Sequence, residues 1–189
     1  MQLSLSRTLG QMRLVLKDPE SVGPFTVYEV FRDDSDGWAN KTVIYPGKLG
    51  EEYTKTFGHY HPEGAPDEVY RVIEGEGILE LQKKHLGNDQ LVSFQVDEVL
   101  LIKAKSGDEI VITPEYGHSW SNVGSTPLIL LDDWEVGHTG ADYEQIGKFH
   151  GMAYYLVELN GGPRAFPNPN YENLPEPVFL TAKEFKRPS

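Results

Sequence analysis

The sequence predicts an all-β fold, a small barrel or sandwich, from three observations. Short β-rich runs recur between residues 25 and 135, turn residues separate most of them, and helical periodicity is nearly absent. Many short strands with this punctuation are typical of barrels and sandwiches. The 189 residues fit one domain over 1–189, with a core at about 25–135 and an extension at 136–189.

The elements follow in order from an N-terminal arm, residues 1–24, where we expect one strand or a short helix between Asp-Pro and Gly-Pro breaks. Ten strands are expected next, at 25–32, 41–45, 52–60, 68–74, 77–83, 90–95, 98–104, 108–113, 118–122 and 128–134. A helical turn is expected at 141–147 and a further strand at 153–158. The tail, 163–189, is too rich in proline for a central strand or a long helix, so we expect it to wrap the surface or be partly disordered.

Composition limits the kinds of function. The chain has no cysteine, which excludes disulfides and thiolate metal ligands. Its net charge of −12, without a Lys/Arg cluster, argues against nucleic acid as a partner. The apolar runs are too short to predict a membrane span or a signal peptide, so a cytoplasmic protein is expected. An anionic substrate would have to be attracted by local donors rather than by the overall charge.

Three histidines and one glutamate form the strongest pattern. His59 and His61 are two residues apart, so on a strand their side chains share one face. Glu68 opens the next expected strand, and His118 follows a turn and could close the site from another strand. Such a set suits one divalent ion, Fe, Mn, Ni, Co or Zn. An H-x-H pair alone is often coincidental, and Glu68 and His118 strengthen the prediction.

These residues resemble the cupin superfamily, whose double-stranded β-helix, or jelly-roll barrel, is therefore the expected architecture. The first cupin motif is matched by His59, His61, Glu68 and Gly75, and the second by Gly107, Pro114, His118 and Asn122. The gap between His61 and Glu68 is longer than in most cupins and resembles that of the archaeal-type, cupin-fold glucose-6-phosphate isomerases. The segments 27–30, 42–48, 56–61 and 68–70 also resemble that family, as does Gly137-His138 followed by Tyr143.

The resemblance implies a cytoplasmic, homodimeric isomerase of glycolysis and gluconeogenesis that acts on a sugar phosphate and binds one divalent metal ion, with Fe2+ preferred. The implied metal ligands are His59, His61, Glu68 and His118. The implied substrate and phosphate contacts are Tyr28, Thr42, Thr56, Gly58 and Tyr143, and the implied catalytic residues are Glu68, His138 and Tyr70.

Two chemical routes fit an aldose–ketose isomerisation. One passes through an enediol and needs a base, for which Glu68 is a candidate, although metal ligation would weaken its basicity. The other is a hydride shift assisted by a metal. His138 is an alternative group for ring opening or proton transfer. The sequence does not choose between the routes.

Strand parity tests one contact, because Thr56 is three residues from His59 and would face the opposite side of a regular strand. We therefore expect a bulge or irregularity near Phe57 and Gly58, without which Thr56 would be doubtful as a phosphate contact.

Three other functions remain open from the sequence. The same ligands would serve a cupin dioxygenase that uses Fe or Ni, and the fold would also serve a non-catalytic cupin that binds a sugar phosphate or stores metal. A purely structural barrel ranks last, because burying three histidines and a glutamate without an ion is costly.

Overall fold

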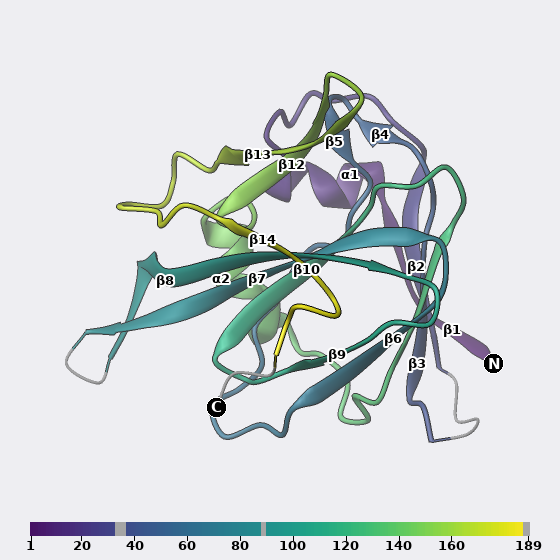
Figure 1. Ribbon diagram of the computed structural model, residues 1–189, viewed down its shortest axis with the longest axis horizontal. Helices are drawn as coiled ribbons and strands as arrows, with labels where there is room; N and C mark the ends of the chain where they lie inside the picture. Colours follow the sequence, from purple (N-terminus) through teal and green to yellow (C-terminus); the bar gives the residue numbers. More distant parts are fainter. Residues whose placement is uncertain (33–36, 88–89, 187–189) are drawn as a thin grey trace.

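The computed structural model describes residues 1–32, 37–87 and 90–186, and β-strands dominate it (Figure 1). The largest sheet has six strands in the spatial order β1 (Gln2–Thr8), β2 (Thr26–Arg32), β3 (Asn40–Ile44), β11 (Leu128–Asp132), β6 (Glu68–Glu74) and β9 (Glu109–Ile112). All the pairings within this sheet are antiparallel.

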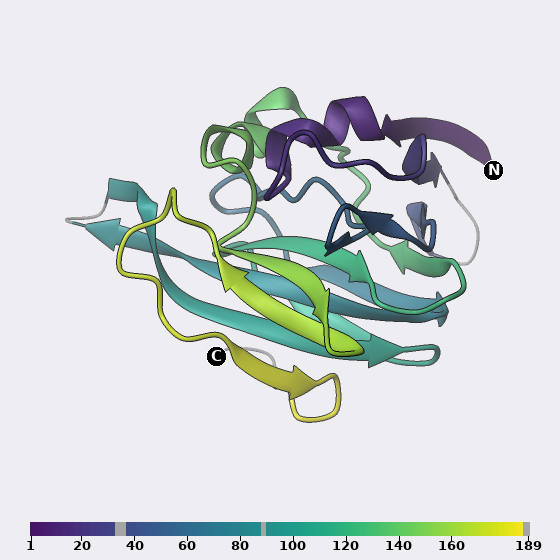
Figure 2. The same cartoon turned by 90° about the horizontal axis from the view of Figure 1, so that it is seen from above.

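Two four-stranded sheets complete the architecture. The second sheet consists of β10 (Tyr116–Asn122), β7 (Glu76–Gly87), β8 (Gln90–Lys105) and β14 (Val178–Thr181). The third consists of β13 (Gly162–Pro167), β12 (Tyr154–Leu159), β5 (Glu52–Tyr53) and β4 (Lys48–Leu49). The helical segments are α1 (Leu9–Met12), a 3-10 turn (Arg13–Val15) and α2 (Gly140–Lys148). Figure 2 shows α1 and α2 on the side of the molecule opposite β14.

The main core lies between the first two sheets. Ile44, Val72 and Leu130 of the first sheet join Leu79 and Ile102 of the second sheet in one buried cluster. A second cluster fixes the third sheet against the outer face of the second, through Tyr53 and Leu156 packed on Ile78 and Leu101. Alternate residues of β7 thus enter different clusters, as the two-residue period of a strand requires. Two facing sheets, antiparallel except for the pairing of β14 with β8, confirm the predicted all-β, jelly-roll class.

Three expected strands differ from the structure. The runs 90–95 and 98–104 form one continuous strand, β8, because Asp97 does not break it: its carboxylate lies 2.6 Å from Nδ1 of His85 on the neighbouring strand β7. The expected strand 52–60 ends at Tyr53. Beyond it, the chain pairs with β10 only through isolated bridges, Lys55 with Ser121 and His59 with His118.

Both ends of the chain join the sheets. The expected arm contains a strand and a helical turn, and β1 pairs along β2 while Met12, Val15 and Leu16 are buried in the main core. The tail supplies two edge strands, β13 beside β12 and β14 parallel to β8. Edge positions are where a strand tolerates proline, since no ladder donor is lost. The expected helical turn 141–147 and strand 153–158 are present as α2 and β12. The described residues include no helix long and apolar enough to cross a membrane.

Candidate functional site

The four expected metal ligands meet in the interior of the barrel. His59, His61, Glu68 and His118 are all buried, and one ligand atom from each lies within 4.8 Å of the others. Nε2 of His59 is 3.2 Å from Nε2 of His61, and Oε2 of Glu68 is 3.3 Å from Nε2 of His61 and 3.1 Å from Nε2 of His118. Atoms bound at about 2.1 Å to one ion are about 3.0–3.4 Å apart, so the cluster has the dimensions of a metal site.

Backbone pairing holds these side chains in place. The amide of His59 donates to the His118 carbonyl at 3.1 Å, and the amide of His118 donates to the His59 carbonyl at 2.9 Å. The Lys84 ammonium donates to the carbonyls of His61 and Pro114, each at 3.1 Å, which ties the histidine segment to the turn before β10. These bonds fix the backbone that carries the three histidines relative to β10.

Several polar atoms of this cluster are buried without a hydrogen-bond partner. Both carboxylate oxygens of Glu68 and both ring nitrogens of His118 are buried and unsatisfied. Burial alone would raise the pKa of Glu68, but the His118 and His61 imidazoles outweigh it and lower this pKa to about 2. Burial and the neighbouring histidines lower the pKa of His59, so its ring is neutral. A carboxylate and neutral imidazoles with free electron pairs are the form in which such residues bind a divalent cation.

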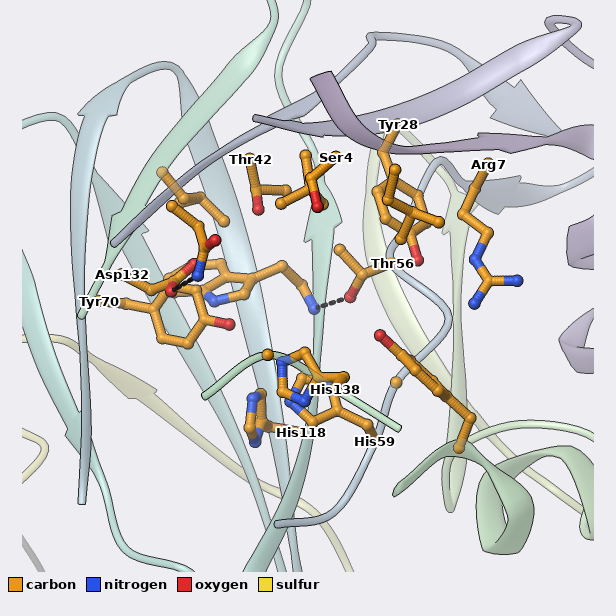
Figure 3. Close-up of a pocket in the computed structure, with 18 of the residues that line it drawn as sticks. Ser4, Arg7, Tyr28, Thr42, Thr56, His59, Tyr70, His118, Asp132 and His138 are labelled. Atoms are coloured by element: carbon orange, nitrogen blue, oxygen red, sulfur yellow. Dashed lines mark hydrogen bonds between the residues drawn. The ribbon is translucent and has the colours of Figure 1, made fainter. Parts of the chain in front are cut away.

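A cavity of about 370 Å³ opens beside the cluster. It is lined by every expected substrate contact and by His138 and Tyr70, and Figure 3 shows the labelled residues projecting into the same space. The residues sequence reasoning placed at the site are thus brought together: Tyr28, Thr42, Thr56, Gly58, His59, Tyr70, His118, His138 and Tyr143. His61 and Glu68 lie behind this lining, in the metal cluster.

The expected irregularity brings Thr56 to the cavity. Gly58 has φ +85°, a value that glycine adopts without strain, and a Cβ there would lie 2.9 Å from Sδ of Met152. The chain before it turns so that the Thr56 hydroxyl lies 3.2 Å from the Ser119 hydroxyl and accepts from the Trp120 amide at 3.0 Å. Thr56 and His59 therefore face one space despite their odd spacing.

His138 and Tyr70 lie beside the four candidate metal ligands. The ring of His138 lies 3.8 Å from that of His59, centroid to centroid, and its Nδ1 is 3.9 Å from Oδ2 of Asp142. Its side chain is 21 % exposed, and burial lowers its pKa to about 4. The pKa of Tyr70 is raised by burial and by the nearby charges of Glu68 and Asp132. At neutral pH the site thus offers a neutral imidazole and a neutral phenol.

Sequence reasoning missed several residues of this region. Arg7 and Asp132 line the cavity, and Trp134 stacks on His61 with centroids 3.9 Å apart. Asn40 donates to Asp132 at 2.7 Å and to the Trp134 carbonyl at 2.9 Å. Burial and the charge of Glu68 raise the pKa of Asp132 to about 7. The signal for Asp132 was its place at the end of a buried strand; no local signal marks Arg7.

Comparison with known proteins gives a family match over most of the chain. The family described as Glucose-6-phosphate isomerase (GPI) matches residues 25–171. The chain is 31% identical over 150 residues to a glucose-6-phosphate isomerase of Thermococcus onnurineus, covering 78% of this chain and 72% of that protein. It is 29% identical over 159 residues to a glucose-6-phosphate isomerase of Pyrococcus furiosus, covering 83% and 77%.

Solved structures give a weaker likeness. A predicted oxalate decarboxylase from Thermotoga maritima has a TM-score of 0.41 at 16% identity and covers 70% of this chain and 90% of that one. The cupin domain of Drosophila melanogaster CENP-C has a TM-score of 0.38 at 13% identity, with 60% and 74% covered.

Proposed function

The chain belongs to the glucose-6-phosphate isomerase family, and from this we propose that it interconverts glucose 6-phosphate and fructose 6-phosphate with one bound divalent metal ion. The observation that supports this most is the position of the His59, His61, Glu68 and His118 cluster beside a cavity lined by hydroxyl groups. A metal bound there would polarise the oxygens of the sugar, and Tyr and Thr hydroxyls suit a phosphate group.

The proton chemistry falls to His138 in this proposal. A carboxylate with a pKa near 2 that also ligates a metal is a weak base, so Glu68 acts as a ligand. His138 is neutral at pH 7 and lies at the cavity wall next to His59, so its imidazole can accept a proton from the substrate and return it. The Tyr70 hydroxyl, kept protonated by its surroundings, can donate to a sugar oxygen that gains negative charge.

The phosphate end is proposed to be held by Tyr28, Thr42, Thr56 and Tyr143 together with the Gly58 amide, all at the cavity. We propose Fe2+ as the ion, while three imidazoles and one carboxylate suit Mn, Ni, Co or Zn as well. A homodimer and a cytoplasmic location stay predictions, to be tested by sedimentation and by cell fractionation.

The test is a coupled assay of fructose 6-phosphate conversion to glucose 6-phosphate, with metal analysis of the purified protein. Activity should vanish after treatment with EDTA and return when a divalent metal is added. His61→Ala should lose both metal and activity, while His85→Ala, which removes a histidine paired with Asp97 on the β7–β8 hairpin, should keep both. Turnover that survives complete removal of metal would contradict the proposal, as would oxygen-dependent turnover or sugar-phosphate binding without conversion.

A further inference from the structure

An arginine faces the hydroxyl-lined end of the cavity. Arg7 of β1 is the register partner of Tyr28 on β2, and both residues line the cavity. The guanidinium carbon lies 5.2 Å from the ring centroid of Phe57 and 5.2 Å from that of Tyr143. Figure 3 shows Arg7 and Tyr28 on one side of the cavity and Asp132 on the other. The positive charge is therefore held at a defined place by aromatic rings.

Arg7 has no carboxylate partner within the described ranges 1–32, 37–87 and 90–186, although acidic residues of the chain outnumber basic ones by 29 to 17. Four other cationic side chains of the described residues form ion pairs with carboxylates, namely Lys17, Lys48, Lys55 and Arg71. No ion pair among the residues that the structure describes includes Arg7, and its Nε is buried without an acceptor. A buried donor without an acceptor costs free energy, which an anionic ligand at this place would recover.

We propose that Arg7 binds the phosphate group of the substrate and selects phosphorylated over neutral sugars, an inference that rests on the proposed isomerase function. A guanidinium presents a planar set of donors that matches two phosphate oxygens at once. It also supplies the local positive charge that a chain of net charge −12 needs in order to attract an anion. The family match begins at residue 25, so Arg7 lies outside the matched segment.

The charge distribution would also orient the substrate. Asp132 lies across the cavity from Arg7, and its carboxyl already accepts from Asn40 and from the Trp134 amide. A phosphate dianion is attracted to the guanidinium of Arg7, whereas the Asp132 side of the cavity offers it only an acidic group. The uncharged end of the sugar is then directed towards Asp132 and the histidines, which is the direction that isomerisation at C1 and C2 requires.

The test compares Arg7→Met with the wild-type protein, both loaded with metal. Methionine keeps an unbranched apolar stem against Phe57 and Tyr143 and removes the charge. We expect the KM for fructose 6-phosphate and the Kd for inorganic phosphate, measured by calorimetry, to rise about 10- to 100-fold, as loss of a charged hydrogen-bond donor predicts. The kcat should change less than about threefold, because Arg7 is placed away from the reacting carbons. Arg7→Lys should restore part of the phosphate affinity.

Arg164→Met is the matched control, since it removes an arginine from the exposed face of the edge strand β13. It should leave both constants unchanged. An Arg7→Met protein with the wild-type Tm and an unchanged phosphate Kd would overturn the inference, and so would a lower Tm and kcat with phosphate affinity intact. If Arg7→Met does not fold, Arg7→Gln and Arg7→Lys supply the same comparison. Loss of phosphate affinity in a protein whose wild type shows no isomerisation would refute the proposed function and support the role of Arg7.

Discussion

Glu80 is a buried carboxyl whose removal should make the protein more stable at alkaline pH. It lies on β7, is 4 % exposed, and its Oε1 accepts from the Tyr154 amide at 2.9 Å. Burial raises its pKa from 4.5 to about 8, and the bond from Tyr154 and the charge of Lys55 oppose this only in part. Lys55 is already engaged by Glu52, at 2.5 Å between Nζ and Oε2.

The sign follows from proton binding. Between pH 4.5 and 8 the folded chain keeps a proton on Glu80 that the unfolded chain has lost, so the free energy of unfolding falls as pH rises through this window. At about 1.4 kcal/mol for each tenfold change in proton affinity, the full loss is about 5 kcal/mol. Entry of water next to a buried charge reduces such penalties, so we expect about 2–4 kcal/mol at pH 9.

The perturbation is Glu80→Gln, which stays neutral and keeps an oxygen for the Tyr154 amide. The free energy of unfolding is measured by urea unfolding of the metal-free proteins at pH 5.5, 7, 8 and 9. The advantage of the variant over the wild type should grow as the pH rises to 8 and stay constant above pH 8. Glu76 is an exposed glutamate of the same strand. For Glu76→Gln, the difference from the wild type in the free energy of unfolding should not change with pH. If the difference between Glu80→Gln and the wild type is also independent of pH, the reasoning is refuted.

Three further predictions concern the metal site. Removal of metal with EDTA should lower the Tm and re-addition should restore it, since an ion that binds only the folded state stabilises that state; an unchanged Tm by scanning calorimetry would contradict this. Gly117→Ala should cost about 1–3 kcal/mol and weaken metal binding, because the added Cβ would lie 2.6 Å from the Tyr60 ring, whereas Gly124→Ala should be tolerated in urea unfolding. Lys84→Met should weaken metal affinity by freeing the His61 carbonyl, and Lys83→Met should not, as metal titration would show.

The group of four candidate metal ligands could be predicted from the sequence because these residues carry local signals. His59 and His61 have the spacing of one strand face, and Glu68 and His118 each stand at the start of a β-rich run. The exact path of the chain could not be predicted. The run 52–60 has the composition of a strand. Beyond Tyr53, however, it pairs with β10 only through isolated bridges, and Gly58 has a positive φ.

Arg7 and Asp132 were missed because only long-range pairing brings them to the site. Arg7 reaches the cavity because β1 adds to the edge of β2, and nothing in residues 1–24 encodes that partner. Asp132 faces the cavity because β11 lies between β3 and β6. The single strand β8 was read as two because aspartate is depleted in strands, while the contact of Asp97 with His85 is visible only in three dimensions.

The place of β11 in the six-stranded sheet has a consequence for folding order. β3 and β6 are each paired to β11 and lie on its two sides, although β11 comes much later in the chain. During synthesis, β3 and β6 are made before β11. The strand edges that pair with β11 therefore stay unpaired until Leu128–Asp132 has been synthesised. Such distant pairing slows folding and exposes edges to other chains meanwhile. The barrel, and with it the alignment of the four metal ligands, is therefore completed late in synthesis.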